Sequence, residues 1–178
     1  MLDMQLIKSA KLSKKLQGIL AAVRSLRRCR RGWRAKPHKL VLLLSVIDLY
    51  ESGLLIDNRV YLNEELENRF RFYFRMVAEK GDWCQIGPPF FHLRSSGFWF
   101  HCVRPHRLVT YERMKTPGGG KGNVIANVEY AYLAQDMLDV LADDEARAVL
   151  RDEIVELLIR DTSNPAAHGL RTERYNAG

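Results

Sequence analysis

The sequence predicts one α+β domain that is predominantly helical. Several long segments place apolar side chains at helical spacing, whereas only short segments between residues 58 and 103 read as extended. Hydrophobic residues make up 47% of the chain and aromatic residues 10%, which argues against a disordered chain. A length of 178 residues suits one domain with one hydrophobic core.

The first expected helix covers residues 12–29, after a separate N-terminal segment over residues 1–11. Its apolar side chains recur at helical spacing, with lysine and arginine between them: Leu16, Ile19, Leu20, Val23 and Leu26. This pattern predicts an amphipathic helix with a basic outer face. Gly32 and Trp33 then interrupt the pattern.

A second helix is expected over residues 37–53, because Pro37 suits a first helical position and Gly53 suits a helix end. After Lys39 its side chains are apolar almost all round, which predicts the central helix of the core. Its first turn is polar and basic, and the free N–H groups at a helix start carry partial positive charge. The start of this helix is therefore a candidate phosphate site.

A short extended segment over residues 58–62 precedes a third helix, which Asn63 is expected to cap. The helix covers residues 63–80. Its expected buried stripe consists of five apolar and aromatic residues: Leu66, Phe70, Tyr73, Phe74 and Val77. Residues 81–87 then read as a loop.

The second half of the chain predicts a hairpin followed by two helices. Residues 90–93 and 98–103 read as two strands, joined by a turn over residues 94–97. Residues 117–123 form a glycine-rich flexible loop, and helices follow over about 127–141 and 143–160. The inward side of the last helix is expected to carry Ala148, Leu150, Ile154, Leu157 and Leu158.

The tail over residues 161–178 shows no periodicity and is expected to be flexible. The order helix, helix, short strand, helix and hairpin is typical of a winged-helix-like domain, here with added C-terminal helices. The sequence therefore predicts one such domain over residues 12–160.

Positive charge is concentrated at the start of the chain. Residues 1–40 carry twelve Lys and Arg against a single acid, Asp3, whereas the rest of the chain carries sixteen basic and twenty acidic residues. The tract over residues 24–39 holds six arginines around Trp33, a composition that suits phosphate groups. Nucleic acid is the favoured partner. A solvated basic face and an anionic membrane surface are the alternatives.

Other classes of function are disfavoured by the sequence. The N-terminus lacks a secretory pattern, and the longest apolar run, residues 40–44, is too short to span a membrane. Three cysteines form no disulfide framework, which fits the cytoplasm. Histidine and cysteine spacings match no zinc pattern, and the run at residues 118–122 lacks the phosphate-loop spacing. We expect no metal, no cofactor and no catalytic site.

Two stretches of the sequence together resemble a known family. They are KPHKLVLLLSVID over residues 36–48 and GPPFFHLRSSGFW over residues 87–99. The chain resembles the sulfur-binding domain that precedes HNH nuclease domains in type IV restriction enzymes of the McrA type, and the resemblance extends over about residues 12–160. It implies recognition of double-stranded DNA in which a phosphorothioate replaces one backbone phosphate. No HNH pattern follows, so we expect a non-catalytic module whose nuclease is separate or has been removed.

The resemblance places a sulfur pocket at the second stretch, formed by Pro88, Pro89, Phe90, Phe91 and His92. Sulfur is softer and more weakly hydrated than oxygen, so an apolar wall favours it through desolvation and dispersion. Aromatic edges add favourable contacts with sulfur. The alternative is that both phenylalanines belong to the core and that the prolines only terminate a strand.

The expected DNA contacts are basic side chains. Phosphate contacts are assigned to Arg31, Arg34, Lys36, His38, Lys39 and Arg94, those at the helix start by the resemblance. The alternative for His38 is a partly buried capping residue. Base-reading candidates lie after the expected hairpin: Arg113, Lys115 and Lys121.

Three functions follow from these patterns. The favoured one is a binding module for phosphorothioate DNA that directs a restriction nuclease. The second is a winged-helix DNA-binding regulator without sulfur preference. The third is a small nuclease that uses the histidines. A protein-interaction module remains a further alternative.

Overall fold

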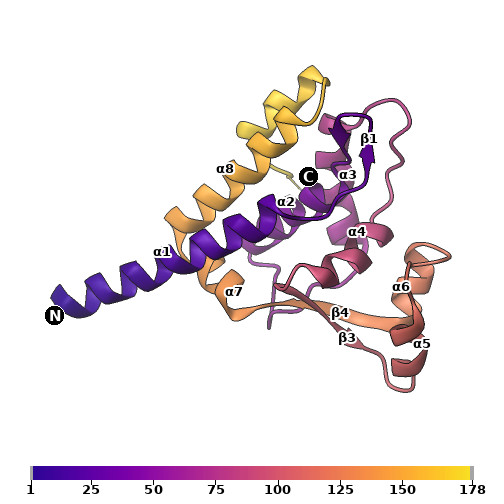
Figure 1. Ribbon diagram of the computed structural model, residues 1–178, viewed down its shortest axis with the longest axis horizontal. Helices are drawn as coiled ribbons and strands as arrows, with labels where there is room; N and C mark the ends of the chain where they lie inside the picture. Colours follow the sequence, from indigo (N-terminus) through magenta and orange to yellow (C-terminus); the bar gives the residue numbers. More distant parts are fainter. Residues whose placement is uncertain (1, 177–178) are drawn as a thin grey trace.

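The computed structural model describes residues 2–176 and confirms a predominantly helical α+β fold (Figure 1). The four longest helices are α1 (Leu2–Arg24), α2 (His38–Glu51), α3 (Glu64–Val77) and α8 (Asp144–Arg160). Shorter helical segments are α4 (Gly87–His92), η1 (Leu93–Ser95), α5 (Leu108–Arg113), α6 (Lys121–Asn127), α7 (Gln135–Ala142) and η2 (Pro165–Arg171). Two small antiparallel sheets pair β1 (Arg30–Arg31) with β2 (Arg34–Ala35), and β3 (Trp99–Val103) with β4 (Val128–Leu133).

Helix α2 is the central element of the core, as the sequence predicts. Every residue from Leu40 to Leu49 is buried, and the helix packs against α3, α4 and α8. The one hydroxyl in this run, on Ser45, donates to the main-chain oxygen of Val41 at 2.7 Å and is therefore satisfied. Gly53 ends the helix with a φ of 70°, a conformation that favours glycine.

The first helix differs from the expectation at both ends. Instead of residues 12–29, α1 covers Leu2–Arg24, so the expected boundary between residues 11 and 12 lies inside a continuous helix, which projects from the body in Figure 1. After Arg24 the chain leaves the helix and forms the β1–β2 hairpin. Gly32 turns this hairpin with a φ of 62°. Residue 1 of the expected N-terminal segment and residues 177–178 of the expected tail lie outside the described residues.

The third helix confirms its predicted cap and stripe. The Asn63 side chain accepts from the backbone N–H of Leu66 at 3.1 Å, and the five residues predicted to face inward are buried. Acidic side chains in the first turn and Arg75 in the last turn complement the helix dipole. The helix ends at Val77, three residues earlier than expected.

The predicted hairpin over residues 90–103 is wrong. Residues 87–92 form helix α4, because Pro88 and Pro89 stand at its start, where their fixed φ and missing N–H fit the first helical turn. The strand that pairs with β3 is β4, with Trp99 opposite Leu133 and His101 opposite Ala131. The expected wing made of neighbouring segments is therefore replaced by a pairing between distant segments.

Two further elements differ from the sequence-based expectation. The glycine run was expected to be a loop through residue 123, but α6 begins at Lys121. The helix expected over about residues 127–141 is strand β4 followed by the short helix α7. Val128, Ala131 and Leu133 of β4 are buried, because one face of the strand packs against the core.

The C-terminal region packs more closely than expected. Helix α8 matches the predicted span, but Ala148 is exposed and Ala146 is the buried alanine. Within the expected flexible tail, η2 packs against α3 and α8 and buries Ala167 and Leu170. Among the described residues, no helix combines the length and the apolar character that a bilayer span requires.

Candidate nucleic-acid interface

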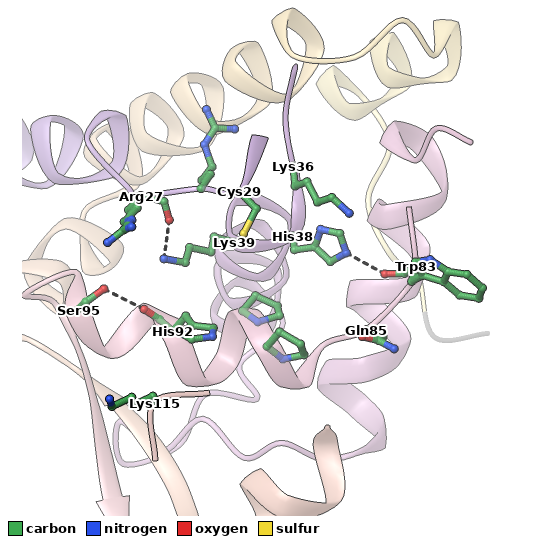
Figure 2. A pocket seen from close by; sticks show the side chains of 13 residues that line it. Arg27, Cys29, Lys36, His38, Lys39, Trp83, Gln85, His92, Ser95 and Lys115 are labelled. Carbon is green, nitrogen blue, oxygen red and sulfur yellow. Dashed lines mark hydrogen bonds between the residues drawn. The ribbon is translucent and has the colours of Figure 1, made fainter. Parts of the chain in front are cut away.

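A pocket lies where the start of α2 meets α4 (Figure 2). Its volume is about 720 Å³. The chain before β1 and the loop after α3 complete its walls. The lining residues are Arg27, Arg28, Cys29, Lys36, His38, Lys39, Trp83, Gln85, Pro88, Pro89, His92, Ser95 and Lys115.

The pocket combines positive charge with an apolar surface. Of the residues that line it, five are lysine or arginine and none is acidic. Arg28 is neutralised, because its Nη1 lies 2.7 Å from Asp161 Oδ2, whereas Lys36 Nζ lies 3.9 Å from its nearest carboxylate, Asp82 Oδ1. Pro88 and Pro89 add pyrrolidine rings to the lining of the same pocket. The combination suits an anion that carries an apolar or weakly hydrated part.

His38 uses one ring nitrogen to hold the neighbouring loop. Its Nε2 lies 2.8 Å from the main-chain oxygen of Trp83 and donates to it (Figure 2). The ring also packs against Phe74, with 4.9 Å between the ring centroids. Burial lowers the pKa of His38, so the ring is neutral at pH 7. The residue therefore positions the pocket wall and adds no charge to it.

Lys39 connects α2 to the chain before β1. Its Nζ donates to the main-chain oxygen of Arg27 at 2.8 Å, as Figure 2 shows. Burial lowers the pKa of this ammonium group. The contact uses only one of its three donors, and the side chain lines the pocket. Lys39 thus shapes the wall and supplies positive charge.

The five residues of the expected sulfur pocket divide into two groups. Pro88, Pro89 and His92 line the pocket, but Phe90 and Phe91 do not. The phenylalanines are 1% and 0% exposed, so they belong to the core, as the alternative reading of the sequence held. The helical geometry of α4 explains the difference, because it turns these two side chains inward.

His92 contributes a neutral ring at the edge of the pocket. Burial lowers its pKa, and the positive charges of Lys39 and Arg94 act in the same direction. Its main-chain oxygen accepts from the Ser95 hydroxyl at 3.0 Å (Figure 2). The end of α4 is fixed in this way.

Two of the expected phosphate contacts have structural roles. Arg34 is 5% exposed and forms ion pairs with Asp82 and Glu79, so it does not reach a ligand in the pocket. Arg94 donates to the main-chain oxygen of Met114 and stacks over Phe91 at 4.0 Å from the ring centroid. It also lies in η1 and not in a hairpin turn. The burial of Arg34 and the intramolecular contacts of Arg94 correct these two assignments.

The remaining predicted DNA contacts lie at several separate places on the protein. Arg31 is exposed on β1 and donates to the main-chain oxygen of Lys80, outside the pocket. Of the base-reading candidates, Lys115 lines the pocket, Arg113 is exposed at the end of α5, and Lys121 pairs with Glu67. The structure thus gathers Lys36, His38, Lys39 and Lys115 at one site and leaves the others elsewhere.

Six lining residues were missed as individual sites: Arg27, Arg28, Cys29, Trp83, Gln85 and Ser95. Arg27 and Arg28 belong to the basic tract, which was a signal for them. Trp83 lies in the polar segment GDWCQIG, where an isolated tryptophan is itself a signal for a binding residue.

His101 lies outside the pocket and among aromatic side chains. Trp99 Nε1 donates to its Nε2 at 3.1 Å, and its Nδ1 lies 2.7 Å from the Tyr111 hydroxyl. Burial lowers the pKa of His101 to about 4. Among the side chains that the structure describes, no three of metal-ligand type gather at a position that could hold a metal ion.

Comparison with known proteins identifies no family for this chain. No protein-family model matches it, and no curated protein matches it either.

Proposed function

We propose that the chain is a non-catalytic DNA-binding module that recognises phosphorothioate in the backbone of double-stranded DNA. The observation that carries the proposal is the meeting of two distant segments at one pocket. Lys36, His38 and Lys39 come from the start of α2, and Pro88, Pro89 and His92 come from α4. These are the two stretches on which the family resemblance depends.

Long-range attraction to DNA is assigned to the cations. Arg27, Lys36, Lys39 and Lys115 surround a pocket that has no acidic residue in its described lining. Such a surface attracts the phosphate backbone whether it contains oxygen or sulfur. Discrimination must therefore come from the apolar part of the pocket.

Sulfur preference is assigned to the proline corner of α4. The rings of Pro88 and Pro89 cannot donate hydrogen bonds, so they compensate poorly for desolvating an oxygen anion. Sulfur loses less hydration there and gains more dispersion energy. His38 and His92 are neutral at pH 7, which keeps additional strongly hydrated charge away from this corner.

A DNA-binding regulator without sulfur preference is the second candidate. The burial of Phe90 and Phe91 favours it, because the apolar wall is smaller than the sequence suggested. The cations remain, so ordinary DNA would bind through its phosphates.

A binding titration separates the two candidates. Matched duplexes with and without one stereodefined phosphorothioate would be titrated at about 150 mM salt, where exposed charges are substantially screened. We expect a preference for sulfur of about 100-fold, which corresponds to about 2.7 kcal/mol. Pro88→Ala combined with Pro89→Ala should reduce the preference, whereas Pro165→Ala, on the distant η2, should leave it unchanged.

Equal affinity for both duplexes would overturn sulfur recognition and favour the regulator. Absence of binding to either duplex would overturn both candidates. Plasmid incubated with the protein and divalent cations should stay intact, because the nuclease that this module would direct is expected on another chain or domain.

A further inference from the structure

Trp83 is the most exposed large apolar residue in the described part of the chain. Its side chain is 73% exposed, although it lines the pocket (Figure 2). Exposed apolar residues scattered singly need no explanation, but an indole at the rim of a charged pocket is a candidate contact for a ligand. Trp33 provides a comparison, because it is 66% exposed and does not line the pocket.

The backbone under Trp83 is firmly held, whereas its indole is free. Its main-chain oxygen accepts from His38 Nε2 at 2.8 Å. The preceding residue, Asp82, accepts from the Glu79 N–H and from the Arg34 guanidinium. A fixed backbone with an unpacked aromatic side chain lowers the entropy lost when a ligand binds.

The same loop is also tied to the β1–β2 hairpin. Arg31 Nη1 donates to the main-chain oxygen of Lys80 at 3.0 Å. At Gly81 the φ is 89°, and an added Cβ would lie 2.1 Å from Arg31 Nη1. The positive φ favours glycine at this position, and Gly81 therefore supports the loop conformation that presents Trp83.

The surroundings of Trp83 select a class of ligand. The pocket beside it carries Lys36 and Lys39 and no acidic residue among its described lining residues. An organic cation would be repelled, and an uncharged peptide would leave the lysines without partners. A ligand that joins an anion to a flat aromatic group satisfies both features, and a nucleotide within a DNA strand is such a ligand.

We propose that Trp83 stacks on the nucleobase next to the backbone anion held in the pocket. This inference rests on the proposed function and deepens it. Bases in a regular duplex are covered by their neighbours, so the nucleotide beside the pocket has to be unpaired or extruded. The preferred substrate is therefore DNA with one unstacked base beside the modified phosphate.

Tryptophan fluorescence tests the inference directly, because the chain has only three tryptophans. Trp99 is fully buried and serves as a constant background. Duplexes would carry one phosphorothioate, flanked by a paired base, an unpaired base or an abasic residue. We expect quenching with the unpaired base in the wild type and in Trp33→Phe, loss of that quenching in Trp83→Phe, and no quenching with the abasic duplex.

Affinity gives a second readout, from the anisotropy of a label placed far from the modification. Trp83→Ala should weaken binding to the duplex with the unpaired base by about 5- to 150-fold, the range that one stacked base supplies. The same change should leave binding to the abasic duplex nearly unchanged. Circular dichroism would confirm that the exposed substitution leaves the fold intact.

The outcomes separate the two proposals. Sulfur-selective binding without Trp83-dependent quenching would overturn the stacking inference and leave the proposed function standing. Trp83-dependent quenching with equal affinity for sulfur and oxygen duplexes would overturn sulfur recognition and support stacking. Quenching that disappears in Trp33→Phe would also overturn the inference, and absence of any DNA binding would overturn both.

Discussion

Arg34 and Asp82 form a buried ion pair, with 2.7 Å between Arg34 Nη1 and Asp82 Oδ2. Arg34 also donates to the main-chain oxygens of Val77 and Asp161, each at 3.0 Å. Burial acts to raise the pKa of Asp82, but the Glu79 N–H and the guanidinium outweigh it and lower the pKa. One arginine thus joins β2 to the end of α3, to the end of α8 and to the loop that carries Trp83.

Removing this arginine should destabilise the fold. We expect Arg34→Ala to lower the free energy of unfolding by about 3–5 kcal/mol, because Asp82 would be left buried without its charged partner. Chemical denaturation measures the change. Arg75→Ala is the matched control, since Arg75 is exposed at the end of α3 and should contribute less than about 0.5 kcal/mol. Unchanged stability with weakened DNA binding would instead make Arg34 a phosphate contact.

Gly87 is a position where the backbone leaves no room for a side chain. A Cβ added there would lie 2.8 Å from the main-chain nitrogen of Lys121 and 3.1 Å from the carbonyl carbon of Gly120. We expect Gly87→Ala to destabilise the protein by about 1–3 kcal/mol, because α4 and α6 would have to separate. Thermal or denaturant unfolding measures this change.

Gly18 provides the opposite case within the same protein. It lies inside α1, and no heavy atom lies within 4 Å of the Cβ that alanine would add. Gly18→Ala should therefore stabilise the protein by about 0.5–1 kcal/mol through helix propensity. If both glycine substitutions changed stability in the same direction, the packing of α4 against α6 would not explain the Gly87 result.

The pocket lysines should control the salt dependence of DNA binding. If about six phosphates are neutralised, the slope of log K against log salt is about −5 for a duplex. Lys36→Ala and Lys115→Ala should each reduce this slope by about 0.9 and weaken sulfur and oxygen duplexes equally. Titrations at several salt concentrations measure the slope.

Arg174→Ala is the control for that experiment, because Arg174 is exposed in the C-terminal region and does not line the pocket. Its slope should equal that of the wild type. Lysine variants with an unchanged slope would mean that the DNA backbone does not pass over this pocket.

Local patterns predicted the helices that need no distant partner to be recognised. In α2 the apolar run is long enough to predict a buried helix by itself. In α3 the Asn63 cap and the apolar stripe through Phe70 both predict the same helix. The segment over residues 87–103 failed for a non-local reason. Its second strand pairs with residues 128–133, and that pairing is invisible in a short window of sequence.

Only part of the candidate site was predicted, because some of its contacts also join distant segments. The stretches over residues 36–48 and 87–99 contribute six of the expected residues to one pocket. Phe90 and Phe91 were misplaced because strand spacing exposes alternate residues, whereas the helical turn of α4 buries both. Trp83 was missed because its position depends on a hydrogen bond from His38, a contact across the fold.

Stability should fall as the pH is lowered from about 6.5 to 4. Burial lowers the pKa of His101 to about 4, so between these values the unfolded state binds the proton and the folded state does not. Unfolding free energy therefore rises with pH in this window. At pH 5 the neutral His101 should account for a loss on the order of 2 kcal/mol relative to pH 7. His38 and His92 have lowered pKa values and act in the same direction.

A His101→Gln variant tests whether His101 causes this pH dependence of stability. Its unfolding free energy should vary less with pH than that of the wild type between about pH 4.5 and 6.5. This range lies between the ordinary pKa values of the carboxylates and of histidine. The lowered pKa values of Glu79 and Asp82 act mainly below this range, and their contribution is present in both proteins and cancels in the comparison. Burial raises the pKa of Asp48 and opposes the trend, but this contribution is present in both proteins and cancels in the comparison.

His168→Gln, at an exposed position, should keep the wild-type slope. An unchanged slope in His101→Gln would show that the buried aromatic cluster accepts a proton without unfolding.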